Sequence, residues 1–208
     1  MVSIRWQRYA PLTGVVFVVL MIISFIVQGK RLSAHASGAE VIAHYKAHHA
    51  SAMASSWLSA LAIIFFVFFA AALSSHLRQF QAARTPVELA LAGAAVLAVG
   101  VASFAAFRWS LADARNTLVP AAAQALNVLN EDFVWPFLIG IAIFGIAAGL
   151  AIVRSRVLPV WLGWIAIVLG ILGVTPASFV AFLVLMAWTL LVSVLLFRSQ
   201  AAPAAAAS

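Results

Sequence analysis

Long apolar runs separated by short charged segments dominate the hydropathy pattern of the chain. A run of about 20 apolar residues crosses a bilayer as a helix, because in lipid a helix hydrogen-bonds every backbone amide within its own segment. The last run is about twice that length and has Thr175-Pro176 near its middle, so it predicts two crossings joined by a tight turn. The pattern predicts an all-α integral membrane bundle of six transmembrane helices, at residues 11–28, 57–74, 87–108, 133–153, 158–174 and 177–197.

These spans form one predicted domain, residues 1–199, and the low-complexity segment 200–208 is predicted to be a disordered tail. The basic N-terminus, the first apolar run and Ala34-His35-Ala36 together resemble a secretory signal with its cleavage site. Lys30 and Arg31 stand between the run and that site, which favours a retained first helix. The stretch "AEVIAHYKAHHA", residues 39–50, predicts a short amphipathic helix on the outer surface after the first span.

Composition supports a membrane protein, since 66% of the 208 residues are hydrophobic and 8% are charged. The net charge of +7 is spread over the ends of the spans without a basic cluster, so we expect no nucleic-acid partner. The chain has no cysteine, which excludes disulfides, thiol nucleophiles and iron–sulfur clusters. The expected partners are membrane lipid and a hydrophobic small molecule, and a homo-oligomer is possible.

The distribution of basic residues predicts the orientation in the membrane. With a cytoplasmic N-terminus, the inner side collects Arg5, Arg8, Arg78, Arg84, Arg154, Arg156 and Arg198. The outer side then holds Lys30, Arg31, Lys46, Arg108 and Arg115. This excess of basic residues on one side, with Trp6, Trp161 and Trp164 at the inner interface and Trp57, Trp109 and Trp135 at the outer, follows the positive-inside rule and the aromatic belt. It predicts a multi-pass protein of the inner (cytoplasmic) membrane with both termini in the cytoplasm.

Three of the five histidines gather within residues 39–50. His44 and His48 are four positions apart, a spacing that can bring two imidazoles to one metal ion on a helix face. A third ligand would come from the same side of the membrane, from His35, Asp113, Glu131 or Asp132. The alternatives are histidines that face water on a surface helix, with His49 nearest to burial, or histidines that sense pH. No cofactor is predicted from the sequence, and a metal or haem at this cluster is an open possibility.

Most carboxylates have a structural interpretation. Residues 37–40 and 85–88 each match the capping-box pattern of a helix start. Residues 131–132 are expected in the first turn of the span 133–153, where negative charge meets the positive end of the helix dipole. Asp113 fits neither role, so it is either a surface ion-pair partner of Arg108 and Arg115 or a candidate site residue.

Small residues predict close helix packing at two places. Gly145 and Gly149 form a GxxxG pattern in the fourth span. Alanines four residues apart follow the third span, at Ala90, Ala94, Ala98, Ala102 and Ala106. Packing within the chain is favoured over a dimer face.

Two stretches carry a resemblance to a known family: "SGAEVIAHYKAHHA" after the first span and "LPVWLGW", residues 158–164, at the start of the fifth. The chain resembles small bacterial multi-pass membrane proteins catalogued as a domain of unknown function, which have an "AxEIxxYYxxH"-like stretch and an "LPxWLGW" stretch at these places. Lys46 replaces the second tyrosine of the first pattern. The resemblance implies six membrane helices and supplies no activity or ligand.

Together these observations favour a non-enzymatic membrane protein that binds a lipid or hydrophobic small molecule, or that assists a partner in the envelope. Aromatic side chains of the second and sixth spans are candidates to line a cavity, although a position in the core or against lipid is favoured for them: Phe65, Phe66, Phe68, Phe69 and Trp188. A first alternative is a metal or haem enzyme that uses His44 and His48. A second is a transporter or channel for an uncharged or lipophilic solute, which the absence of charged residues near the span centres disfavours.

Overall fold

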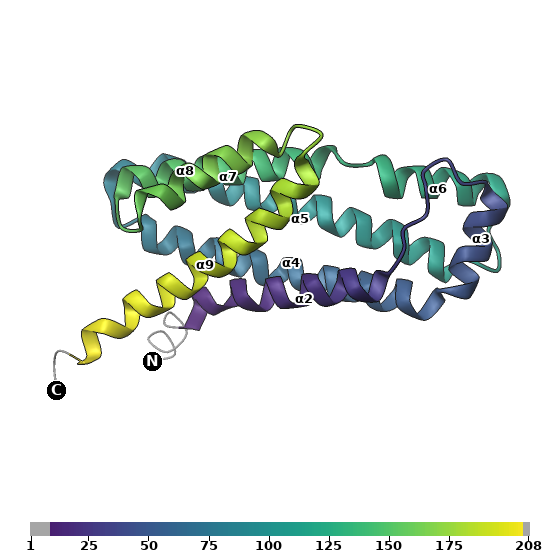
Figure 1. The fold of residues 1–208 in the computed structure, drawn as a ribbon, viewed down its shortest axis with the longest axis horizontal. Helices are drawn as coiled ribbons and strands as arrows, with labels where there is room; N and C mark the ends of the chain where they lie inside the picture. Colours follow the sequence, from purple (N-terminus) through teal and green to yellow (C-terminus); the bar gives the residue numbers. More distant parts are fainter. Residues whose placement is uncertain (1–8, 206–208) are drawn as a thin grey trace.

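Long helices lie side by side along one axis of the molecule (Figure 1). The structure is a computed structural model and describes residues 9–205, so the predictions for Arg5, Trp6 and Arg8 fall outside the described residues. The chain begins with a 3-10 turn, η1 (Ala10–Leu12), and a second turn, η2 (Gln81–Ala83), precedes α5. The α-helices are α2 (Thr13–Gln28), α3 (Gly38–Ala47), α4 (His49–Leu77), α5 (Arg84–Asp113), α6 (Pro120–Asp132), α7 (Trp135–Ser155), α8 (Val160–Leu172) and α9 (Ser178–Ala205).

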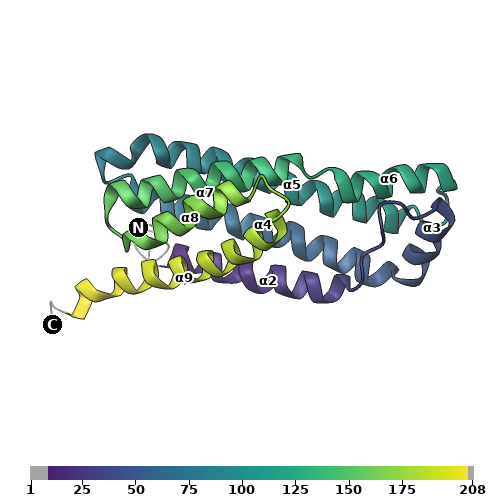
Figure 2. The same ribbon diagram turned by 45° about the horizontal axis from the view of Figure 1, so that its top comes forward.

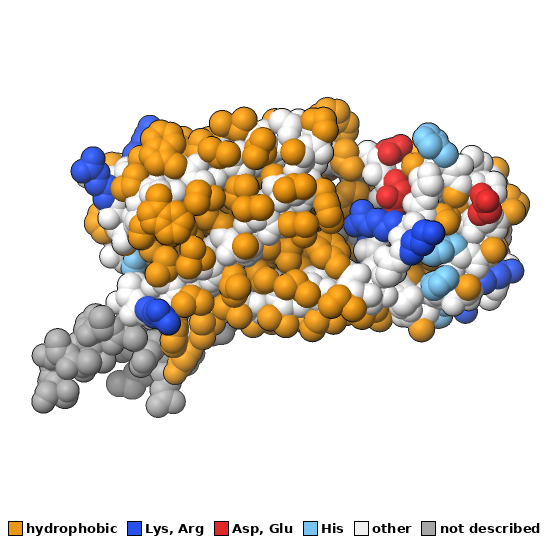
Figure 3. All heavy atoms as spheres, in the orientation of Figure 1, with side chains coloured by type: hydrophobic (Ala, Val, Ile, Leu, Met, Phe, Trp, Pro, Cys, Tyr) orange, Lys and Arg blue, Asp and Glu red, His pale blue; other side chains and the backbone are white. Residues whose placement is uncertain are grey.

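Five helical segments of the described chain are long and apolar enough to cross a membrane: Ala10–Gln28, His49–Leu77, Gln81–Asp113, Pro120–Ser155 and Ser178–Ser199. Hydrophobic side chains cover the length of the helical bundle, and charged and histidine side chains gather at its two ends (Figure 3). The all-α membrane architecture is therefore confirmed. α8 is apolar but has 13 residues, about 20 Å of helix against a hydrocarbon core of about 30 Å. The predicted crossing at 158–174 thus remains a prediction.

Several helices extend beyond the predicted spans at the end away from the termini. α4 begins at His49 rather than at residue 57, and α5 continues to Asp113 rather than ending at residue 108. Together with α3 and α6, these helix ends form a structure that we call the cap, on the right in Figure 1. A small hydrophobic core of its own stabilises the cap, formed by Ala36, Val41, Tyr45, Ala52, Leu111, Ala112 and Ala123. The apolar face of α3 therefore packs against protein.

Two predictions about helix starts are wrong, and one is confirmed. The capping box at residues 37–40 forms as predicted, with the amide of Ser37 donating to Glu40 Oε2 at 2.8 Å. Residues 85–88 form no capping box, because η2 leads directly into α5. The N-cap of α5 is Ala83, which makes no side-chain hydrogen bond. Residues 131–132 end α6 instead of beginning α7, since α7 starts only at Trp135 with Pro136 in its first turn.

The C-terminal helix is longer than its predicted span. α9 continues through Ala205, so the first six residues of the predicted disordered tail are helical, and residues 206–208 lie outside the described residues. α2 begins and α9 ends at the same end of the molecule, opposite the cap, in both ribbon views (Figures 1 and 2). The indole nitrogen of Trp188 donates to the carbonyl of Leu162 at 2.9 Å and links α9 to α8.

Glycines set the closest helix contacts, with α7 between α5 and α8. A methyl group on Gly145 would lie 2.8 Å from the Ala166 carbonyl oxygen, and one on Gly149 would overlap the Gly163 carbonyl oxygen. The GxxxG pattern thus packs within the chain, as favoured from the sequence. The alanine stripe of α5 packs against other helices over half its length only. Ala90 and Ala94 are buried, whereas Ala102 and Ala106 are exposed.

Replacing Gly149 with leucine is expected to lower stability by about 1–3 kcal/mol or more, because the added side chain forces α7 and α8 apart. Thermal denaturation of the detergent-solubilised protein, followed by circular dichroism, measures the effect. Ala102→Leu adds bulk to an exposed position of α5 and is the matched control. Equal melting temperatures of the two variants would contradict the role of this contact.

Candidate functional site

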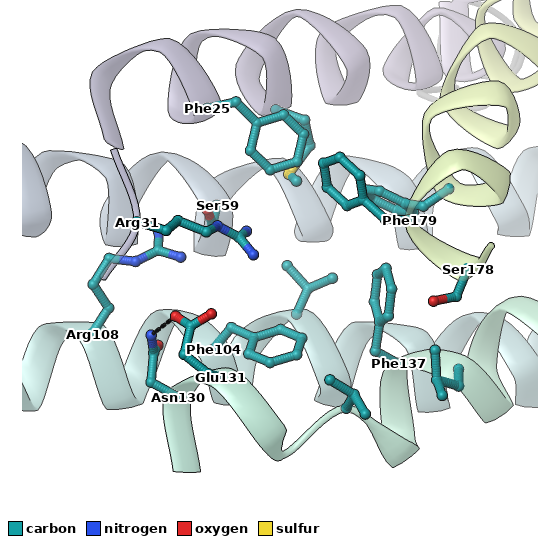
Figure 4. Close-up of a pocket in the computed structure, with 15 residues that line it drawn as sticks. Phe25, Arg31, Ser59, Phe104, Arg108, Asn130, Glu131, Phe137, Ser178 and Phe179 are labelled. Carbon is teal, nitrogen blue, oxygen red and sulfur yellow. Dashed lines mark hydrogen bonds between the residues drawn. The ribbon is translucent and has the colours of Figure 1, made fainter. Parts of the chain in front are cut away.

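A cavity of about 180 Å³ lies beneath the cap, between α2, α5, α7 and the first turn of α9 (Figure 4). Its charged side chains gather at one end together with Ser59 and Asn130, and Phe25, Phe137 and Phe179 lie toward the other end, next to Ser178. The polar lining consists of Arg31, Ser59, Arg108, Asn130, Glu131 and Ser178. The apolar lining consists of Met21, Phe25, Val101, Phe104, Val134, Phe137, Leu138, Phe179 and Phe182. The cavity therefore combines two guanidinium groups with a mostly aromatic wall.

Arg108 is buried at the polar end, with 6% of its surface exposed. Its Nη1 donates to Ser55 Oγ on α4 at 3.3 Å, while its Nε is buried without a partner. Ser55 is in turn tied to α2, because Ser24 Oγ donates to the Ser55 carbonyl at 2.9 Å. Ser24 Oγ also lies 2.8 Å from Ser59 Oγ, so a small serine network positions this end of the cavity.

Arg31 reaches the cavity from the loop that follows α2. α2 ends where Gly29 adopts a left-handed conformation with φ of 65°, which glycine tolerates without strain. The loop is held to α6, because Asn127 Nδ2 donates to the Ser33 carbonyl at 2.9 Å. The Arg31 guanidinium carbon lies 6.0 Å from the ring centroid of Phe179, within the range of a cation–π contact. This exposed arginine therefore lies at the rim, over the start of α9.

Asn130 and Glu131 enter from the last turn of α6. Asn130 Nδ2 donates to Glu131 Oε1 at 2.9 Å, and Asn130 Oδ1 is buried without a partner. Within the described residues, no carboxylate forms an ion pair with Arg31 or Arg108. The polar end thus carries two positive charges, one negative charge and two buried polar atoms that lack hydrogen bonds.

A smaller cavity of about 20 Å³ adjoins the polar end and shares Arg31, Arg108, Asn130 and Glu131 with the larger one. It has room for about one water molecule. His44, Tyr45 and His48 of the histidine cluster also line it. Burial raises the pKa of Tyr45, an effect that the nearby Arg108 opposes, and the phenol stays protonated at neutral pH.

The structure brings His44 and His48 together, but not on one helix. α3 ends at Ala47, and His48 has φ of −115°, so the helix does not continue through residues 39–50 as predicted. The two rings stack with centroids 4.6 Å apart, and His48 Nδ1 lies 3.0 Å from the His44 carbonyl oxygen. Residues 9–205 include no group of three metal-ligating side chains, so a metal at this pair stays a prediction. His49, half-buried at the start of α4, lines neither cavity.

Asp113 is exposed at the end of α5, and neither predicted ion pair forms. Arg108 turns inward to Ser55, and Arg115 Nη1 donates to the Ala112 carbonyl at 3.0 Å. The predicted surface pair is therefore wrong, because the side chain of Arg108 lies on the buried face of its helix. Asp113 lines neither cavity.

The aromatic candidates for cavity lining lie elsewhere, in accord with the position in the core or on the outer surface that is favoured from the sequence. Phe66, Phe69 and Trp188 are buried in the helix core, and Phe68 is 46% exposed. Phe65 packs against that core, and none of the five lines the cavity. The actual lining includes Arg108, whose burial the sequence does indicate: Val101, Ala105, Arg108 and Ala112 recur at helical spacing on one face of α5 and are all buried.

The chain matches one known family, described as "Domain of unknown function (DUF4386)", over residues 12–185. The chain belongs to this family. The match confirms the resemblance seen in the sequence and covers every residue that lines the cavity of this DUF4386 protein. No curated protein and no solved structure matched the chain.

The His44 pKa is expected below its usual value of about 6.5, because His44 is partly buried and His48 repels its charged form. The folded state then favours neutral His44, so this contribution to stability is present above pH 6.5 and is lost as the pH falls below it. NMR titration of isotope-labelled histidine measures the pKa. His48→Gln removes the neighbouring charge and should raise it, and an unchanged value would contradict the coupling.

Proposed function

We propose that this DUF4386 protein binds a lipid or another hydrophobic molecule in the cavity beneath the cap, without transforming it. The observation that carries the proposal is the cavity itself, which has an aromatic wall in the apolar part of the bundle. Its volume of about 180 Å³ exceeds that of an engineered apolar cavity of about 150 Å³ that holds benzene. The cavity therefore has room for one end of an amphiphile, and the rest of that molecule lies outside the cavity.

The rim of the cavity supports access from the membrane. Phe179, at the start of α9, lines the cavity and is 50% exposed, whereas Phe182 one turn later is buried. The loop between α8 and α9 stops short of the cap (Figure 1), so the first turn of α9 forms the edge of the cavity. A hydrocarbon chain can thus contact these rings without leaving an apolar environment.

The polar end favours binding over catalysis. A guanidinium group remains protonated at ordinary pH, so Arg31 and Arg108 hold an anion but exchange no proton with it. The hydroxyl of Ser59 is engaged with Ser24, and the Glu131 carboxylate accepts from Asn130. The polar groups thus orient a bound molecule more readily than they react with it.

The protein is expected to retain amphiphile when purified in mild neutral detergent, at up to one molecule per chain. Mass spectrometry of the extracted protein identifies and counts it. Leu138→Trp fills the cavity and should reduce the amount severalfold, whereas Ile139→Trp places the same ring on an exposed, non-lining position of α7. Protein that carries no amphiphile, or equal amounts in both variants, would contradict the proposal.

We further infer six crossings of the inner membrane with both termini in the cytoplasm. This inference is supported by the position of the α2 start and the α9 end at one end of the molecule, which accords with an even number of crossings (Figure 1). α8 runs toward the cap between α7 and α9 and supplies the additional pass. The same end of the helices carries Arg78, Arg84, Arg154, Arg156 and Arg198, in accord with the positive-inside rule.

The absence of native cysteine allows a direct test of this topology. Thr117→Cys places a reporter on the cap, and Ser199→Cys places one near the end of α9. In intact cells with a permeabilised outer membrane, a membrane-impermeant maleimide should label residue 117 and spare residue 199 until the inner membrane is disrupted. The reverse labelling pattern would overturn the orientation, and labelling of both would overturn the even number of crossings.

A further inference from the structure

We infer that the cavity selects a single-chain amphiphile with a compact carboxylate headgroup, held between the guanidinium groups of Arg108 and Arg31. The hydrocarbon chain lies along the phenylalanine wall toward α9. This inference rests on the proposed binding of an amphiphile and adds the charge and size of its headgroup. Neither arginine has a carboxylate partner among the described residues, so an anionic ligand would supply one.

The burial of Arg108 provides the first argument. A buried charge without a counter-charge is costly, because its water shell is lost and nothing replaces it. Arg108 is 6% exposed, makes one long hydrogen bond of 3.3 Å to Ser55, and has an unpartnered Nε. A carboxylate at the cavity side would compensate the charge of the guanidinium group in a short, charge-assisted hydrogen bond.

The second argument is the depth of the polar end. Trp109, next to Arg108 on α5, packs edge to face on Trp57 of α4 with ring centroids 5.5 Å apart, and Trp57 is 65% exposed. Exposed tryptophans of membrane proteins lie at the level of the lipid headgroups. Arg108 therefore lies where the headgroup of a membrane amphiphile lies, and the phenylalanine wall begins on the hydrocarbon side of it (Figure 4).

Space at the polar end limits the size of the headgroup. The cavity beyond the arginines has a volume of about 20 Å³, enough for about one water molecule. Such a water could donate to the unpartnered Asn130 Oδ1. This small volume favours a compact carboxylate over a phosphodiester that carries a further polar group.

Glu131 is the one carboxylate that lines the cavity, and it opposes an anion. Its Oε1 accepts from Asn130 Nδ2, which holds it at the α6 side. The two arginines outweigh it, so the net charge at the polar end stays positive. Glu131→Gln removes the repulsion and should tighten binding of a carboxylate relative to that of an alcohol.

The test compares palmitic acid with hexadecanol, which have the same chain and different headgroups. Both compete with tritiated palmitate for the full-length protein in neutral phosphatidylcholine nanodiscs, at pH 9 so that the carboxyl group is ionised. We expect palmitate to bind at least about tenfold more tightly than hexadecanol, the effect of one charge-assisted hydrogen bond. Arg108→Gln should remove most of this preference, and Arg108→Lys should retain a larger part of it.

Arg31→Gln provides a variant that does not disturb the core, because Arg31 is exposed. It should weaken palmitate binding about threefold, as expected of an exposed charge pair, and so lower the preference for palmitate over hexadecanol. Lys46→Gln makes the same change of charge on the cap at an exposed position that lines neither cavity, and should change neither affinity. The melting temperature of each variant shows whether it is folded. If Arg108→Gln does not fold, the palmitate affinity of Arg31→Gln tests the headgroup preference.

The outcomes separate this inference from the proposed function. Equal affinity for palmitate and hexadecanol, both lowered by Leu138→Trp, would overturn the headgroup preference and leave lipid binding in place. Displacement of palmitate by millimolar acetate would show a site for a free anion and would overturn the role of the chain. Binding of neither compound, in protein that carries no amphiphile, would overturn the proposed function itself.

Discussion

Close approach of helix backbones is the constraint on which the bundle depends, because helices in lipid gain little from the hydrophobic effect when they associate. α7 approaches a neighbouring helix closely on two sides, α5 on one and α8 on the other. A methyl group on Gly100 of α5 would collide with the Phe137 backbone, and Gly149 and Gly163 oppose each other between α7 and α8. These three helices form a tight layer, and the remaining helices are arranged around it.

α9 contacts this layer in a different way. It has no glycine, and it meets α7 through rings, with Phe182 against Phe137 at 4.9 Å and Trp188 against Phe144 at 6.2 Å between centroids. Bulky edge-to-face contacts hold helix axes further apart than glycine contacts do. The cavity lies where the first turn of α9 faces α7, so the same bundle provides both rigidity and space.

The sequence predicted those features that depend on local pattern. Apolar run length gave the membrane helices, the residues 37–40 gave the start of α3, and GxxxG gave a packing contact that the structure confirms. The cap and the cavity depend on contacts between distant segments, which one sequence does not display. Arg108 illustrates the difference: the helical spacing of its apolar neighbours indicates that it lies on a buried face, but that spacing does not identify Ser55 of α4 as its partner.

The half-exposed ring of Phe179 at the cavity rim has a consequence for how binding depends on concentration. A ligand that reaches the site laterally is already dissolved in the bilayer, so its mole fraction among the lipids sets the occupancy. Its total concentration in water matters only through partitioning. A longer hydrocarbon chain would then raise the apparent affinity measured from solution while leaving the intrinsic affinity of the site unchanged.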